Sequence, residues 1–362
     1  MQSSSPRSQT EQPIGSSVSS LSSVSSPAPA PAGRIHAPGR VNLIGDHTDY
    51  TGGLVFPMAI DRGTTLSFEP TEARIELTSD AAEGTVLLDL PIAGDPITVT
   101  PQWGRYVAAM ARQFEAVDGF SGTVTSDIPA GAGLSSSAAL ECAVGLALGF
   151  TGSPTELALA AQRAEHAATG VPTGIMDQLC IATARRGHAT LIDCGSLAVE
   201  HVEVPEAIEV VVEFVSQRTL VGSAYADRVA ECARAEAEIG PLREATAGDV
   251  ADARSLDPVA RRRARHVVSE NARVAAFSEA LRSGDIDTAG RLMTESHQSL
   301  RLDFETSTPS MDAAVERALS TPGVHGARMT GGGFGGCIVS IAEPGALGDG
   351  WVVRASAGAR YI

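Results

Sequence analysis

The stretch Ile128–Leu140 reads IPAGAGLSSSAAL and runs directly into an apolar segment that ends near Gly149. A glycine-containing loop that leads into a helix presents backbone amides at the positive end of the helix dipole, which makes the junction an anion site. The three serines add hydroxyl oxygens that suit phosphate or Mg²⁺. The alternative is a flexible turn in which a serine caps the helix, a common way to begin any helix. Glycine-rich loops before helices are frequent, so the pattern alone leaves both interpretations open.

No lysine accompanies this loop, because all 27 basic residues of the chain are arginine. A Walker A loop, a protein-kinase ATP site and a pyridoxal Schiff base each use a lysine. Any nucleotide bound here must therefore be held by glycine backbone, helix dipole, metal ion or arginine.

Length and charge narrow the class of protein. The 362 residues predict two domains at roughly 150 residues each. A net charge of −16 has the wrong sign for neutralising a phosphate backbone, so neither nucleic acid nor an anionic membrane is an expected partner. No run approaches the roughly 18 apolar residues of a membrane span. The five cysteines stand singly, which fits a reducing, cytoplasmic location.

The organisation of the chain is that of a mixed α and β protein. The Ser/Pro/Ala-rich start predicts a disordered tail, and from Arg34 short apolar runs alternate with helical stretches. A polar, proline-containing segment between two predicted strands marks the expected domain boundary. The expected division is a tail at 1–32, an N-terminal domain at 33–205 and a C-terminal domain at 206–362.

Several elements are predicted from local signals. Ser153 and Glu156 form a capping-box pattern that begins a helix, and Gly170 ends it. Further helices are expected at 223–239, 261–282 and 309–319, and strands at 189–192, 209–215, 327–329 and 337–341.

A second polar segment, GRVNLIGDHTDY at Gly39–Tyr50, combines one arginine, two carboxylates and a histidine between glycines. Such a cluster of donors and acceptors suits a polyhydroxylated ligand. The alternative is an ordinary polar loop between strands.

A third segment, MTGGGFGGC at Met329–Cys337, holds five glycines in six positions. This density is costly in backbone entropy, so it predicts close approach of the backbone to a ligand or another loop. Between the second and third segments, Asp177 stands among apolar and small residues. It is either a base acting on a substrate hydroxyl or a buried helix cap.

Taken together, in their order along the chain and in their spacing, the three segments resemble the GHMP kinase superfamily, and within it the galactokinase family. Ile128–Leu140 resembles the superfamily's phosphate-binding loop, Gly39–Tyr50 the galactokinase signature and Met329–Cys337 the C-terminal glycine motif, and the resemblance extends from Arg34 to Ile362. It implies a two-domain α+β GHMP kinase fold. The expected N-terminal domain is like ribosomal protein S5 domain 2, the expected C-terminal domain is ferredoxin-like, and the active site lies in the cleft between them.

The resemblance also implies an activity: ATP-dependent phosphorylation of the anomeric hydroxyl of α-D-galactose, giving galactose 1-phosphate and ADP, the first committed step of galactose catabolism. Asp177 matches the family's catalytic aspartate and Arg40 the arginine beside it, while Glu165 and Ser137 match positions that share Mg²⁺. The implied ATP-binding residues are Gly131, Ala132, Gly133, Leu134, Ser135, Ser136 and Ser137. The implied sugar-binding residues are Asp46, His47, Asp49, Gly174 and Tyr225.

One departure from the family pattern concerns the sugar. The family usually has glutamate where this chain has Asp46, at a position that reaches the sugar's hydroxymethyl group. Two alternatives therefore stand beside galactose phosphorylation: a kinase for another galactose-like sugar, such as N-acetylgalactosamine or arabinose, or a non-catalytic sugar and ATP sensor. A monomer is expected.

Overall fold

The computed structural model describes residues 31–114, 118–129, 131–217 and 223–362. Nearly all of the tail predicted at 1–32 lies outside these residues. Among the described residues, no helix is both long enough and apolar enough to cross a membrane.

The larger sheet is built mainly from the first half of the chain and has the strand order β12-β1-β2-β5-β3-β4, with β6 joining β2 and β7 joining β6. All pairs are antiparallel except β3 with β5. Its strands are β1 (Gly33–Ile44), β2 (Leu54–Thr71), β3 (Arg74–Ser79), β4 (Val86–Asp89), β5 (Gly119–Ser126), β6 (His188–Asp193), β7 (Ala198–Glu203) and β12 (Arg360–Tyr361).

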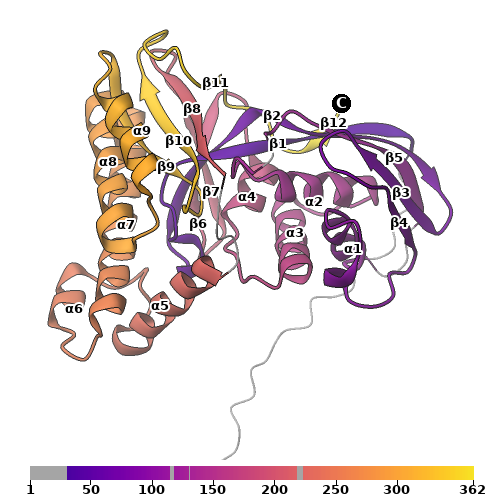
Figure 1. Ribbon diagram of the computed structural model, residues 1–362, viewed down its shortest axis with the longest axis horizontal. Helices are drawn as coiled ribbons and strands as arrows, with labels where there is room; N and C mark the ends of the chain where they lie inside the picture. Colours follow the sequence, from indigo (N-terminus) through magenta and orange to yellow (C-terminus); the bar gives the residue numbers. More distant parts are fainter. Residues whose placement is uncertain (1–30, 115–117, 130, 218–222) are drawn as a thin grey trace, which may run out of the picture.

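Helices cover one face of this sheet (Figure 1). They are α1 (Gly104–Ala111), α2 (Ser136–Ala147), α3 (Pro154–Thr169) and α4 (Met176–Thr183), with short 3₁₀ turns at Asp49–Thr51 and Pro96–Thr98. The predicted capping box of α3 is confirmed, since Ser153 N donates to Glu156 at 2.7 Å and Gly170 ends the helix in the left-handed region. Apolar residues of all four helices share one core with β1 and β2.

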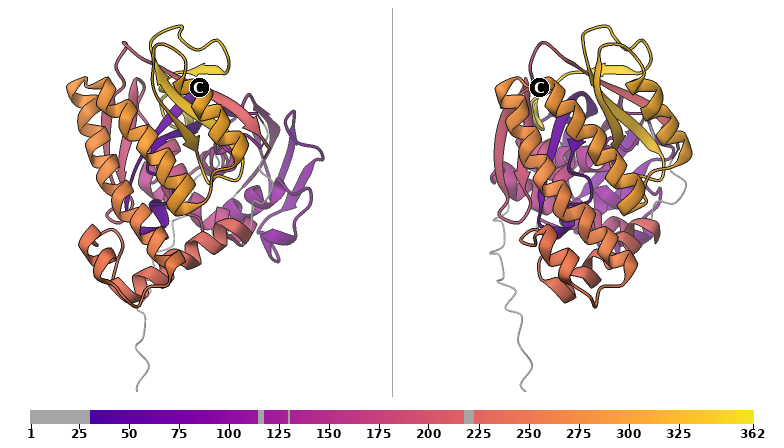
Figure 2. Two further views of the ribbon diagram at one scale, coloured as in Figure 1. Left: turned by 60° about the vertical axis from the view of Figure 1, so that its left-hand side comes forward. Right: turned by 90° about the vertical axis from the view of Figure 1, so that its left-hand side faces the viewer.

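The second sheet is antiparallel, with strand order β11-β8-β10-β9. Its strands are β8 (Glu209–Ser216), β9 (Val324–Thr330), β10 (Gly336–Ala342) and β11 (Trp351–Val353). The helices of this half are α5 (Ser223–Ile239), α6 (Ala247–Asp252), α7 (Pro258–Ser283), α8 (Ile286–Ser299) and α9 (Pro309–Leu319), with a π-helical turn at Leu300–Phe304 between α8 and α9. Figure 2 shows α7 and α8 side by side at the edge of the molecule.

The sequence signals did not predict β7, α6 or α8, and they set no bounds for α1, α4, β11, β12 or the first five strands. The strand β7 occupies the polar segment that was expected to be a boundary, and only Val202 of its six residues is buried. A strand with one buried side chain gives almost no apolar alternation to detect. The chain passes from the first sheet to the second between Glu203 and Glu209, and we propose the domain division there.

The two halves share a core of their own. Leu43 of β1, Phe56 of β2, Val339 of β10 and Phe277 of α7 belong to one buried cluster, and the rings of Phe56 and Phe277 meet edge to face at 5.4 Å. The strand β12 also returns from the end of the chain to pair with β1. Because tightly packed interiors transmit position from one element to the next, this core fixes how residues of the two halves meet.

Candidate active site

A cavity of about 860 Å³ is lined by residues of both halves. It gathers the phosphate loop, the Gly39–Tyr50 segment and the glycine motif, which lie far apart in the sequence. Of the residues predicted for the site, all but Ala132 line it: Arg40, Asp46, His47, Asp49, Gly131, Gly133, Leu134, Ser135, Ser136, Ser137, Glu165, Gly174, Asp177 and Tyr225.

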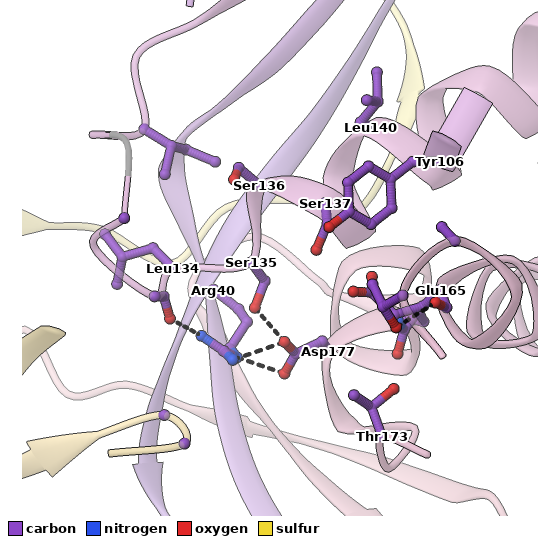
Figure 3. Close-up of a pocket in the computed structure, with 18 of the residues that line it drawn as sticks. Arg40, Tyr106, Leu134, Ser135, Ser136, Ser137, Leu140, Glu165, Thr173 and Asp177 are labelled. Atoms are coloured by element: carbon purple, nitrogen blue, oxygen red, sulfur yellow. Dashed lines mark hydrogen bonds and ion pairs between the residues drawn. The ribbon is translucent and has the colours of Figure 1, made fainter. Parts of the chain in front are cut away.

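Asp177 and Arg40 form a two-pronged ion pair at the centre of the cavity (Figure 3). Arg40 Nε and Nη2 each donate to a different carboxylate oxygen of Asp177 at 2.7 Å. Asp177 lies in the first turn of α4 but does not cap it, which excludes the helix-cap alternative. The side chain of Arg40 is 5% exposed and that of Asp177 28%, so the aspartate is the partner that reaches into the cavity.

Ser135 contributes to the same cluster by donating its hydroxyl to Asp177. Its backbone is in the left-handed region, with φ of 64°, and its side chain makes no capping hydrogen bond to α2. The capping-serine alternative is therefore wrong for Ser135. The first amides of a helix have no partner within the helix, so the start of α2 remains suited to an anion.

Close packing against β1 positions the phosphate loop. A Cβ added to Gly39 would lie 2.7 Å from the carbonyl oxygen of Leu134, so only glycine allows this approach. Arg40 then holds two loop carbonyls, donating from its backbone N–H to Leu134 O at 3.1 Å and from Nη1 to Gly133 O at 2.7 Å. The arginine of the predicted sugar segment thereby also shapes the predicted phosphate loop.

Ala132 differs from its prediction as an ATP-binding residue. It is buried, does not line the cavity, and donates its N–H to Pro129 O at 3.2 Å. Its amide is already committed to the turn that shapes the loop, so Ala132 supports the loop rather than presenting a donor to a ligand.

Glu165 and Ser137 fit a small divalent cation. One carboxylate oxygen of Glu165 is buried without a hydrogen-bond partner in the described part of the chain, and Ser137 is a hydrogen-bonding neighbour of that carboxylate. Burial raises the pKa of Glu165. Carboxylate and hydroxyl oxygens are ligands that Mg²⁺ accepts, and Mg²⁺ usually completes its shell with water and substrate phosphates.

A second acid, Glu141 of α2, was missed by the sequence reasoning. It is fully buried beside Glu165, and burial followed by Glu165 raises its pKa well above the usual range. It does not line the cavity. A glutamate inside an apolar helix is the signal that would have found it, because charged side chains are rarely buried without a specific neighbour.

At the sugar end predicted by the sequence, Asp49 lies directly against Gly174, where any Cβ would collide with the carboxylate. Burial, with a further contribution from Asp177, raises the pKa of Asp49 to about 7. His47 packs against Phe304 at 4.7 Å and Tyr225 at 5.5 Å between ring centroids. These side chains form a wall with aromatic faces and a carboxylate, which suits a sugar.

Asp46 is held more tightly than its prediction as a free sugar ligand implies. Its Oδ2 lies 2.6 Å from Nη2 of the fully buried Arg328, and its Oδ1 accepts the N–H of Gly331 at 3.1 Å. The glycine motif therefore approaches the sugar segment through its backbone, as its glycine density predicted. Burial raises the pKa of Asp46, while Arg328 lowers it.

Side chains of helix α7 that the sequence analysis did not identify form hydrogen bonds with the backbone in and just after this segment. Glu270 accepts the N–H of Gly45 at 3.0 Å, Asn271 accepts that of Leu54 at 2.8 Å, and His266 Nε2 donates to Asp46 O at 3.1 Å. Burial lowers the pKa of His266 to about 4, which leaves it neutral. Burial raises the pKa of Glu270, but nearby cations, Arg273 first, outweigh this and hold it at about 2.

Three family models match the chain: the galactokinase galactose-binding signature over residues 25–70, the GHMP kinase N-terminal domain over 104–185 and the GHMP kinase C-terminal domain over 277–349. A galactokinase of Bos taurus is 44% identical over 326 residues, which cover 85% of this chain and 83% of the relative. A galactokinase of Homo sapiens is 42% identical with the same coverage.

Solved structures give the same result. The crystal structure of Lactococcus lactis galactokinase complexed with galactose matches with a TM-score of 0.84 and 30% identity, covering 91% of this chain and 95% of that one. A mevalonate kinase from Methanococcus jannaschii, 22% identical with a TM-score of 0.60, shows the shared two-domain α+β GHMP fold, as predicted.

Proposed function

The chain belongs to the galactokinase family of the GHMP kinases and has galactokinase function, and from that premise we propose how its residues carry the reaction. The substrates are galactose and ATP, and the products are galactose 1-phosphate and ADP. The observation that carries the proposal is the ion pair of Arg40 and Asp177 inside a cavity that the phosphate loop and the sugar segment both line.

Asp177 is the residue that holds the anomeric hydroxyl and accepts its proton. Its carboxylate reaches into the cavity, and Arg40 and Ser135 fix its orientation. Arg40 also places a permanent positive charge beside the transferring phosphoryl group, where it stabilises the charge that develops. Phosphoryl transfer depends chiefly on this kind of positioning and electrostatics.

The start of α2 and the loop before it bind the phosphates of ATP. Gly133, Leu134, Ser135 and Ser136 line the cavity at the positive end of the helix dipole. Glu165 and Ser137 hold Mg²⁺, which neutralises charge on the phosphate oxygens when it is bound. This arrangement replaces the lysine that the chain lacks.

The sugar is bound at the opposite end, by the carboxylates of Asp49 and Asp46 and the wall of His47, Tyr225 and Gly174. This division is supported by the galactokinase signature match over residues 25–70, which contains three of the five residues. A second candidate substrate, another galactose-like sugar, is favoured by Asp46, because an aspartate places its carboxylate one methylene further back than a glutamate. A cytoplasmic, monomeric enzyme also remains our proposal.

The test is an ADP-release assay with ATP, with and without Mg²⁺, on galactose, glucose, N-acetylgalactosamine, 2-deoxygalactose and arabinose. We expect Mg²⁺-dependent turnover with galactose as the preferred sugar. Faster turnover of another sugar would assign the chain a different substrate, and binding without turnover would make it a sensor.

A further inference from the structure

Arg328 of β9 has no role in the phosphoryl transfer described above, yet it is the largest fully buried side chain among the described residues. It carries a permanent charge, and none of its three side-chain nitrogens, Nε, Nη1 and Nη2, has a hydrogen-bond partner within the described residues. Burying an arginine this incompletely paired is costly. A position that only filled the core would be served by an apolar residue of similar volume.

The carboxylate nearest to Arg328 is one that lines the cavity. Asp46 Oδ2 lies 2.6 Å from Arg328 Nη2, and Gly331, three residues further along the chain, donates its N–H to the other oxygen. Asp46 is 1% exposed and still lines the cavity. The strand β9 and the loop after it therefore contact both oxygens of the same carboxylate.

The backbone that carries this carboxylate is held as well. Glu270 and His266 fix the peptide groups of Gly45 and Asp46 from α7. The hydrogen bonds to the backbone thus fix the position of the Asp46 main chain, and Arg328 fixes the position of its carboxylate. Asp46 has little freedom left with which to reach toward a substrate.

We propose that Arg328 is a positioning residue that fixes the Asp46 carboxylate as the charged acceptor for a sugar hydroxyl, so that a buried cation of the C-terminal half controls sugar affinity. This inference rests on the proposed function, because it takes the occupant of that end of the cavity to be the sugar. Arg328 acts through Asp46 and touches neither substrate.

The first variants are Arg328→Met, which removes the charge at similar volume, and Arg328→Lys, which restores a charge. In Arg328→Met we expect the galactose KM to rise at least about tenfold, with the ATP KM within about twofold of wild type. Arg328→Lys is expected to recover part of the loss. Equal increases in both KM values, or an unchanged galactose KM, would overturn the proposal.

Arg328→Met leaves Asp46 as an unpaired buried charge and can fail to fold. The double variant Asp46→Asn/Arg328→Met removes both charges and keeps the test informative. We expect its thermal midpoint to recover while its galactose KM stays high, because the neutral amide of asparagine is a weaker acceptor than the charged carboxylate. Recovery of the galactose KM together with stability would show that the pair is only structural.

A matched control separates loss of stability from loss of sugar binding. Met311 of α9 is fully buried in the helical core of the C-terminal half and does not line the cavity. Met311→Ala should lower the thermal midpoint and leave the galactose KM unchanged. Wild-type turnover of galactose tests the proposed function separately, whereas the ratio of variant to wild type tests Arg328.

Discussion

The two ends of the cavity are built in different ways. The residues predicted for the phosphate end all come from the N-terminal half, where the first turn of α2, the helix α3 and the start of α4 bring Ser137, Glu165 and Asp177 together. The sugar end is completed from the other half. Gly331 and Asp46 are separated by 285 residues, and Glu270 and Gly45 by 225.

The two ends differ in electrostatics as well as in origin. The phosphate end presents helix amides, hydroxyls and Arg40 beside the carboxylates of Asp177 and Glu165, and we propose that it receives the phosphates of ATP. The sugar end holds the carboxylates of Asp46 and Asp49, whose pKa values burial raises. Phosphoryl transfer and sugar recognition are thus assigned to different surfaces of the cavity, so substitutions at the two ends should change different kinetic constants.

The largest expected effect is at the meeting point of the two ends. Asp177→Ala should lower kcat by about 10³-fold, because the acceptor for the hydroxyl proton is lost, while the dissociation constant of an ATP analogue stays within about twofold. Steady-state rates and calorimetric titration measure the two quantities. Asp177→Asn, which keeps the shape of the side chain, should be similarly inactive. Activity within about twofold of wild type would contradict the assigned role.

The same contrast explains how much of the site the sequence predicted. The phosphate loop and the sugar segment are each one continuous stretch of sequence, and their residue types indicate what each of them binds. Of the predicted site residues, Ala132 alone does not line the cavity, because its amide is used within a turn. A composition of glycine and serine cannot tell which amide of a loop faces inward.

Arg328, Glu270 and His266 escaped prediction because their importance lies in contacts across the two halves. Arg328 directly precedes the glycine motif, and a charge inside the apolar strand β9 was the available signal. Glu270 and His266 lie one helical turn apart on the long helix α7, a spacing that also describes ordinary surface pairs. Only the packing of α7 under Gly45 and Asp46 distinguishes the two cases.

The elements were predicted where caps and apolar runs marked them. The helix α3 had a complete capping box, and β8 had apolar residues at 210–212 and 214–215. By contrast, β7 had one buried residue. Local signals therefore predicted elements at both ends of the cavity, such as α3 and α7, and missed others, such as α4, that had no such signal.

The second prediction concerns the metal at the phosphate end. Glu165→Gln should raise the Mg²⁺ concentration needed for half-maximal rate on the order of tenfold to a hundredfold, because a neutral amide is a weaker ligand than a carboxylate. A Mg²⁺ titration at fixed ATP and saturating galactose measures it. Glu203→Gln, an exposed glutamate on β7, serves as the control. An unchanged Mg²⁺ requirement would remove Glu165 from the metal site.

The third prediction is a pH dependence at the sugar end. Burial raises the pKa of Asp49 to about 7, so the ionised carboxylate predominates above pH 7 and the neutral acid below it. If the carboxylate binds the sugar, kcat/KM for galactose should fall about tenfold between pH 8 and pH 6, since this profile reports the free enzyme. Asp49→Asn should abolish that transition. A flat wild-type profile, or a transition that persists in the variant, would contradict the role of Asp49.

The smallest expected effect tests whether helix α7 of the C-terminal half affects sugar binding without affecting ATP binding. Glu270→Ala removes the acceptor for the Gly45 N–H and should raise the galactose KM about fivefold, with little change in the ATP KM. Glu270→Gln keeps an acceptor oxygen and should raise it by only about twofold.

The control is Glu295→Ala on the adjacent helix α8, which removes a surface ion pair with Arg291 worth about 1 kcal/mol or less. It should change neither KM. If Glu270→Ala raised both KM values equally, α7 would support the whole cavity, and the separation of the two ends would not hold. A rise confined to galactose means that the helix of one half positions the loop through which the other half binds sugar.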